Sequence, residues 1–135
     1  MGEVRDAEFD LPWPPSVNNY YRHVGPRVLI SREGRKYRRM VVSRLGGLFP
    51  KFTGKVRLAL DCYPPDRRRR DLDNLLKSLQ DALVNAGLLE DDSLVRRLEM
   101  EMLEPIEGGL VHVHVAPLPE RRRPVRIPAS SREGQ

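Results

Sequence analysis

The 135-residue chain contains a single cysteine, Cys62, and this scarcity excludes two kinds of site. One thiol cannot form a disulfide within the chain, and it cannot supply the cysteine ligands of a structural zinc centre. Proteins that work in a reducing compartment commonly lack disulfides. We therefore expect a cytoplasmic protein.

Long hydrophobic runs are also absent. No segment approaches the roughly 20 apolar residues that a membrane-spanning helix needs, so no membrane partner is expected. Lysine is scarce as well, and arginine supplies most of the formal net charge of +5. Because the planar guanidinium can bind a phosphate through two hydrogen bonds, this balance favours a polyanionic partner such as nucleic acid.

Two helices are predicted from apolar spacing and capping residues. Ser31 is the expected N-cap of a strongly basic helix over residues 34–45, which ends at Gly46 and Gly47. A second helix is expected after Asp71, its predicted N-cap, with Gly87 as the left-handed C-cap. Its buried face is marked by leucines at intervals of three and four: Leu72, Leu75, Leu76, Leu79 and Leu83.

Strands are predicted where apolar residues cluster or alternate. The expected strands cover residues 9–13, 27–30, 56–63, 94–103 and 110–115. Segment 16–21 is interpreted as a loop, because Asn and Ser favour turns. Residues 107–109, Glu-Gly-Gly, are expected to form a hairpin turn between the last two strands. These elements predict an α+β fold in which two helices pack on one face of a small mixed sheet.

One domain is expected over residues 1–116, with residues 1–7 as a polar leader. A chain of this length can bury a core of its own. The composition changes at Pro117, after which prolines interrupt regular structure and arginines outnumber glutamates. Residues 117–135 are therefore predicted to be a basic, flexible tail.

The segment from Asp66 to Lys77 carries the strongest chemical signal: four arginines lie among three aspartates where a helix begins. Asp73 and Lys77 are four residues apart and lie off the leucine face, and Asp71 stands at the helix start. Two such carboxylates, with a third from the segment 90–92 (Glu-Asp-Asp), would suit a hard cation such as Mg²⁺. Two carboxylates about 5 Å apart repel by roughly 3 kcal/mol at an effective dielectric near 20, which a bound cation would offset.

A structural interpretation of the same residues stays open. Asp71 can act only as a helix cap, and Asp73 only as a favourable charge in the first turn. The arginine run favours function, because a nuclease must hold a phosphate beside its metal. The residues expected to contact DNA are Arg67, Arg68, Arg69, Arg70, Asn74, Tyr20, Arg22 and His23.

Three other groups have competing interpretations. Tyr20 and its neighbours can stack on bases or contact phosphates, or they can serve the fold. Trp13, followed by two prolines, can enter a DNA branch point, pack at a dimer interface or anchor a rigid loop. His112 and His114 share one strand face, and a structural role there is favoured over metal binding because no cysteine or carboxylate motif lies nearby in sequence.

Several motifs occur in order between about residues 9 and 116. They are Leu-Pro-Trp-Pro-Pro-Ser at 11–16, Asn-Asn-Tyr-Tyr-Arg-His at 18–23, Pro-Asp-Arg-Arg-Arg-Arg-Asp-Leu-Asp-Asn-Leu at 65–75 with Lys77, Asp-Ala-Leu at 81–83, and Ala-Gly at 86–87 followed by Asp91 and Asp92. With these motifs the chain resembles the RusA-type Holliday junction resolvases of bacteria and their prophages. The tail from Pro117 lies beyond the matched region.

The resemblance implies a homodimeric, Mg²⁺-dependent endonuclease that resolves four-way DNA junctions by paired nicks in recombination and repair. The metal-binding aspartates of the family correspond here to Asp71, Asp73 and Asp92, the last rather than Asp91. Its functional lysine corresponds to Lys77, and Asn74 matches a supporting motif residue. A roughly two-fold symmetric junction that is cut twice also favours a two-fold dimer. The alternative function is a non-catalytic protein that binds branched DNA or other nucleic acid.

Overall fold

The alternating segment predicted at 56–63 forms the central strand of the fold. In the computed structural model, which describes residues 5–119, β4 (Val56–Tyr63) buries every second side chain. It pairs antiparallel with β6 (Leu110–Pro117) and parallel with β5 (Val95–Met102). Strand β1 (Ala7–Leu11) pairs antiparallel with β6 and completes a mixed sheet of order β1-β6-β4-β5.

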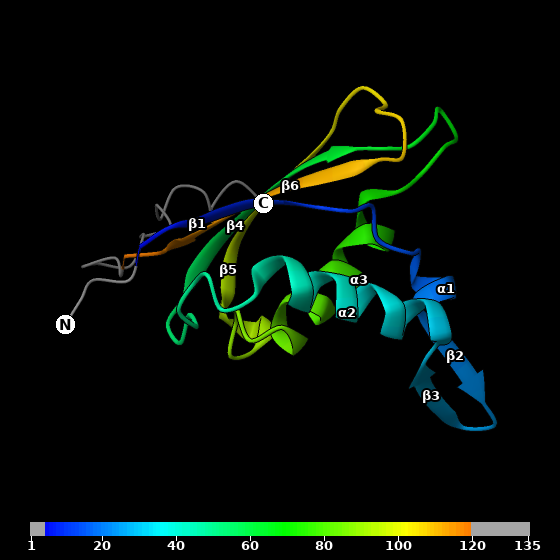
Figure 1. Cartoon of the computed structure of the whole chain (residues 1–135), viewed down its shortest axis with the longest axis horizontal. Helices are drawn as coiled ribbons and strands as arrows, with labels where there is room; N and C mark the ends of the chain where they lie inside the picture. The colour runs from blue at the N-terminus through cyan, green and yellow to red at the C-terminus, as the bar shows by residue number, and fades with distance from the viewer. Residues whose placement is uncertain (1–4, 120–135) are drawn as a thin grey trace, which may run out of the picture.

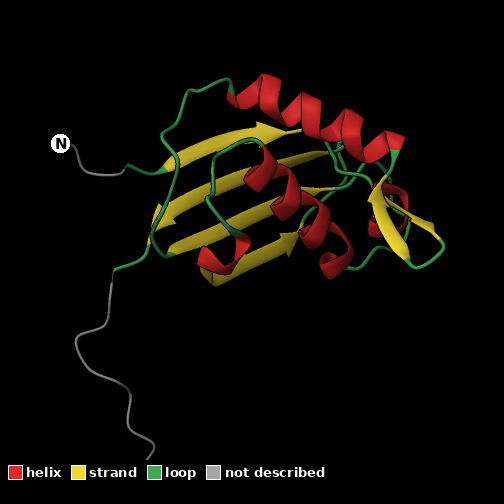
Figure 2. Cartoon of the chain, turned by 90° about the horizontal axis from the view of Figure 1, so that it is seen from below, coloured by secondary structure: helices red, strands yellow, loops and turns green. Residues whose placement is uncertain are grey.

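Both long helices lie on the same face of this sheet, as predicted (Figure 2). Helix α2 (Arg32–Leu45) starts at the expected cap, where the Ser31 hydroxyl accepts a hydrogen bond from the Gly34 amide at 2.9 Å. Helix α3 (Leu72–Asn85) follows Asp71 and is terminated by Gly87, whose φ of 82° is left-handed as expected. Within residues 5–119, no helix is long and apolar enough to span a membrane.

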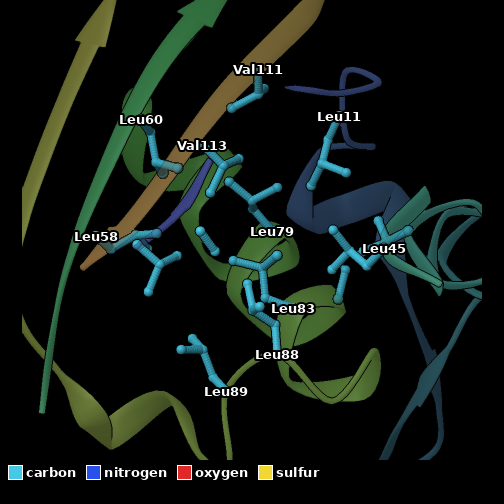
Figure 3. Packing of buried hydrophobic residues seen from close by; sticks show 14 of the residues in the cluster. Leu11, Leu45, Leu58, Leu60, Leu79, Leu83, Leu88, Leu89, Val111 and Val113 are labelled. Carbon is cyan, nitrogen blue, oxygen red and sulfur yellow. The ribbon is translucent and has the colours of Figure 1, made fainter. Parts of the chain in front are cut away.

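The core lies between the two helices and the sheet. Figure 3 shows Leu58 and Leu60 of β4 and Val111 and Val113 of β6 pointing toward leucines of the helices. Burying one such side chain contributes about 1.5–3 kcal/mol. The predicted leucine face of α3 is confirmed, since its central members are 4% exposed or less: Leu75, Leu79 and Leu83.

The hairpin predicted between the last two strands is wrong. The turn at residues 107–109 exists, but β4 lies between β5 and β6, so these two strands are not neighbours. The connection crosses the end of β4, where the Leu103 amide donates to the Cys62 carbonyl and the Ile106 amide to the Pro64 carbonyl. Most side chains of β5 are exposed, which suits an edge strand, whereas every second side chain of β4 is buried, as in a central strand.

The loop predicted at 16–21 is also wrong. Residues Val17–Tyr20 form a short helix, α1, that leads into a separate hairpin of β2 (Tyr21–Val24) and β3 (Arg27–Ile30). In Figure 1 the hairpin projects away from the sheet beside one end of α2. Contacts with α2 explain the single helical turn: a Cβ on Gly34 would lie 2.4 Å from the Tyr20 carbonyl oxygen, so only glycine permits this approach.

The order β4-α3-β5 decides where the predicted acidic residues lie. Because β4 and β5 are parallel and Val56 pairs with Val95, both strands start at the same end of the sheet. Helix α3 runs back between them, and its 14 residues span about 21 Å. Its first turn and the start of β5 therefore lie at opposite ends of the helix.

The folded region extends slightly past the boundary expected at residue 116. Strand β6 reaches Pro117, and the Leu118 amide donates to the Lys55 carbonyl at 2.9 Å. Most of the predicted tail, residues 120–135, lies outside the described residues, as do residues 1–4 of the predicted leader.

Candidate active site

Two exposed carboxylates stand at the start of α3. Asp71 occupies the N-cap position, but its side chain makes no capping hydrogen bond. Asp73 lies in the first helical turn, where the partial positive charge of the helix end favours an anion. Within residues 5–119, neither carboxylate forms an ion pair or a side-chain hydrogen bond, so both are free to bind a cation. The side chain of Asp71 therefore does not cap the helix, and the purely structural interpretation of this residue is not supported.

Asp66 has a different role, because it organises the arginine run. Its carboxylate pairs with Arg70 at 2.8 Å and accepts a hydrogen bond from the Arg68 amide at 2.9 Å. The hydrogen bond from Arg70, followed by that from the Arg68 amide, holds the pKa of Asp66 below its ordinary value. The carboxylate of Asp66 is thus occupied, whereas those of Asp71 and Asp73 are not.

The four arginines at 67–70 differ in how strongly they are held by contacts within the protein. Arg70 pairs with Asp66 and lies over the ring of Trp13, with its guanidinium carbon 5.7 Å from the ring centroid. Arg67, Arg68 and Arg69 are exposed. Arg67 and Glu104 form an ion pair at 3.4 Å with both side chains 80% exposed, and such pairs contribute little. Three arginines thus remain available to a phosphate backbone.

Lys77 lies one turn beyond Asp73 on α3 and is exposed. Its ammonium nitrogen is 5.1 Å from the centroid of the Tyr21 ring, a cation–π contact. Burial is the main cause that raises the pKa of Tyr21, and the charges of Asp81 and Asp92 raise it further. Tyr21, which the sequence did not separate from Tyr20, therefore faces the charged side of α3.

Asp92 is exposed and opens the single 3₁₀ turn η1 (Asp92–Leu94). The neighbouring Asp91 caps this turn, since its carboxylate accepts hydrogen bonds from the amide and hydroxyl of Ser93. These bonds lower the pKa of Asp91 and occupy its carboxylate. Asp92, in contrast, lies at the end of α3 away from Asp71 and Asp73. Across residues 5–119, no group of three acidic, histidine or cysteine side chains is arranged so that it could hold a metal ion.

The predicted DNA-contacting residues of the N-terminal region divide into two groups. Arg22 and His23 are exposed on β2 of the projecting hairpin. Tyr20 is fully buried, and its hydroxyl donates to Asp81 on α3. A buried ring has no free face for a base, so the expectation for Tyr20 is corrected to a structural role.

Both histidines of β6 lie on the open face of the sheet. The His112 ring bridges Asp10 and Glu8, with both N···O distances 2.6 Å, and His114 contacts Asp6 at 2.9 Å. The hydrogen bond with Asp10 is the largest cause that raises the pKa of His112, followed by that with Glu8. These cross-strand pairs agree with the favoured structural interpretation.

A small hollow lies beside Asp71 that sequence reasoning missed. It is lined by Trp13 and Ser16 from the loop before α1, together with Arg69, Arg70, Asp71, Asn74 and Leu75 from the start of α3. Asn74 is thereby brought beside the Trp13 loop. The only sequence signal that Asn74 lies near Trp13 is that the motifs at 11–16 and 65–75 occur in the same family pattern.

Known proteins resemble this chain in sequence over most of its length. Residues 12–116 match the family model described as endodeoxyribonuclease RusA. This chain belongs to the RusA endodeoxyribonuclease family. A crossover junction endodeoxyribonuclease of Enterobacteria phage 82 is 42% identical over 107 residues, covering 78% of this chain and 89% of the relative. RusA proteins of Shigella sonnei strain Ss046 and Escherichia coli strain K12 are 41% and 40% identical over 107 residues, with the same coverage.

Proposed function

We propose that this chain is a Mg²⁺-dependent endonuclease that cuts four-way DNA junctions by paired nicks, acting as a homodimer in DNA recombination and repair. The observation that supports it best is the pair of unpartnered, exposed carboxylates, Asp71 and Asp73, directly after an arginine run. The names of the relatives, crossover junction endodeoxyribonucleases, support the junction as substrate. One carboxylate pair per chain and two cuts per junction support the two-fold dimer.

The donor chemistry of Asp71 and Asp73 fits Mg²⁺. This ion prefers oxygen ligands and commonly takes one or two protein carboxylates, completing its shell with waters and substrate phosphates. When bound, it would lower the pKa of a water and stabilise negative charge on the phosphate. Asp92 remains a proposed third ligand because of its motif position. Since it lies at the other end of α3, its contribution requires a separate test.

The remaining residues have proposed roles in holding DNA. The exposed arginines Arg67, Arg68 and Arg69 would hold the backbone next to the carboxylates, with Arg22 and His23 contacting DNA from the hairpin. Lys77, one turn from Asp73, would place its ammonium against the phosphate and stabilise charge that develops during cleavage. Tyr21 would keep that ammonium on the correct side of α3 through the cation–π contact.

A synthetic four-way junction and a linear duplex of the same sequence test the proposal directly. With Mg²⁺ the protein should nick the junction at paired positions and leave the duplex uncut, and EDTA should abolish both nicks. If no branched substrate gives a metal-dependent product, the non-catalytic alternative is correct. If sedimentation at the assay concentration shows that the active protein is a monomer, the proposed dimer is contradicted, but the proposed cleavage activity is not.

The role of Asp92 has a matched control in its neighbour. Asp92→Asn should lose junction cleavage if this carboxylate binds metal. Asp91→Asn should cleave like the parent, because Asn caps a helical turn about as well as Asp. Equal cleavage by both variants would remove Asp92 from the site and leave Asp71 and Asp73 as the protein ligands.

A further inference from the structure

Apart from Asp71 and Arg69, the residues that line the hollow beside Asp71 have no part in the cleavage chemistry proposed above. Its volume is about 190 Å³. Pockets for drug-sized ligands are roughly 300–1,000 Å³, so this one suits a single ring system rather than a whole nucleotide. Because Asp71 is part of its wall, whatever enters it lies next to the proposed site of cleavage.

Apart from Asp71 and Arg69, the walls carry groups that suit a nucleobase. Arg70 is already paired with Asp66 and stacked on Trp13, so the pair presents a flat surface rather than a free cation. The amide of Asn74 and the hydroxyl of Ser16 can donate to and accept from the edge of a base.

The Trp13 side of the hollow is held in place before any ligand binds. The Tyr37 hydroxyl donates to the Pro12 carbonyl at 2.7 Å, and the Ser78 hydroxyl donates to the Pro15 carbonyl at 3.0 Å. The turn before β6 also approaches Trp13 so closely that a Cβ on Gly109 would lie 2.8 Å from the Cβ of Trp13. The stacking surface is thus preorganised by α2, α3 and this turn.

We propose that the hollow is a subsite for one nucleobase next to the phosphate that is cut, with Trp13 as its stacking surface and Asn74 reading its edge. This inference rests on the proposed function. A base leaves its stack most cheaply where pairing is already disturbed, as at a branch point, so the subsite would help to select junctions over duplex. Stacking on one aromatic ring changes affinity about 5- to 150-fold.

Trp13 is the only tryptophan of the chain, so its fluorescence reports on this hollow alone. The cut phosphate is first mapped on a junction with Mg²⁺. In EDTA, the full-length protein is then titrated with the intact junction and with junctions that lack the base on one or the other side of the cut. The intact junction should quench Trp13, and one abasic junction should not. Equal quenching by all junctions would overturn the subsite.

Two glycines of one turn supply a matched pair of variants. Gly109 and Gly108 have left-handed φ values of 75° and 80°, but a Cβ on Gly108 would meet nothing within 4 Å. Both Ala substitutions therefore strain the backbone similarly, and only Gly109→Ala adds a clash, with the Cβ of Trp13 at 2.8 Å and with Pro65 at 3.1 and 3.2 Å. With Mg²⁺, the parent and Gly108→Ala should cut the intact junction at least about 5-fold faster than the abasic one, a stacking-sized difference.

Gly109→Ala and Trp13→Ala should cut the two junctions at similar rates, whereas Trp13→Phe should keep much of the parent's preference. If Trp13→Ala retains the full preference, the subsite is wrong although cleavage stands. If the parent cuts no junction at all, the proposed function itself fails, and the two failures are thereby distinguished.

Discussion

Asp73 and Asp81 lie on the same face of α3, two turns apart, yet their surroundings are opposite. Asp81 accepts a hydrogen bond from the Tyr20 hydroxyl and pairs with Arg38, whose Nε and Nη2 atoms lie 2.9 and 2.8 Å away. Asp73 has no such partner among residues 5–119. Asp81 therefore links α1 and α2 to α3. Asp73 makes no such contact within the fold, so its carboxylate stays available for a ligand.

The physical reason for the difference lies in the burial of Tyr20. Burial, with the hydrogen bond to Asp81, raises the pKa of this phenol far above its ordinary value, so it stays protonated and donates to the carboxylate. Asp73 is exposed and, among residues 5–119, has no hydrogen-bond or ion-pair partner for its side chain, while the helix dipole favours its negative charge. Identical side chains on one helix thus serve structure and, in our proposal, catalysis.

The largest expected effect follows from the unpartnered carboxylate. Asp73→Asn should lower Mg²⁺-dependent junction cleavage by about 100-fold or more, because losing a metal ligand costs at least as much as losing a residue that orients one. Junction binding should survive or tighten, since a negative charge near DNA is removed. Folding stability should change by less than about 0.5 kcal/mol, as for other exposed substitutions. A variant that cleaves like the parent would contradict the assignment of Asp73.

The arginine run gives the next largest effect. Each neutralised phosphate contributes about −0.9 to the log–log salt slope, so replacing Arg67, Arg68 and Arg69 by alanine should reduce the slope by about 2.7. Between about 50 and 200 mM salt, these three contacts account for roughly a 40-fold loss of affinity. Arg70→Ala is the internal comparison, because this side chain is already engaged by Asp66 and Trp13. A parent with a nearly salt-independent affinity would contradict the phosphate contacts.

Asp81→Asn should reverse the outcome seen for Asp73→Asn. Removing the charged partner of the partly exposed Arg38 should lower the free energy of unfolding by about 1–2 kcal/mol. Cleavage per folded molecule should stay near that of the parent. Denaturant unfolding measures the first quantity, and the cleavage rate at low temperature measures the second. A cleavage defect without a stability loss would contradict the structural role of Asp81 and would mean that it also takes part in the chemistry.

The smallest expected effect is on stability and comes from Asp10 and Glu8, because their partner His112 loses its charge as the pH rises. The pKa of His112 is raised in the folded protein, with Asp10 as the main cause. Its ion pairs therefore stabilise the fold fully below the ordinary pKa of 6.5, and this contribution is lost as the pH rises through the raised value. For such exposed pairs we expect about 0.2–1 kcal/mol. His112→Asn should be less stable than the parent at pH 5.5 and should match it at high pH; a constant difference would contradict this role.

Local periodicity was sufficient for most of the secondary structure. The leucine spacing of α3, the Ser31 cap of α2 and the alternation of β4 depend only on residues close in sequence, and all three are confirmed. The segment 16–21 was mispredicted for the converse reason. Its one helical turn is held by Tyr20 packing against α2 and α3, which no local pattern records.

The sequence by itself determined the family, the helix that carries Asp71 and Asp73, and the basic character around them, because each follows from neighbouring residues in a fixed order. Only the tertiary structure decided which groups meet. It inserted β4 between β5 and β6, put Asp92 at the far end of α3, buried Tyr20 and brought Trp13 beside Asn74. Strand pairing and burial depend on contacts between residues far apart in the chain, and spacing along the sequence does not specify them.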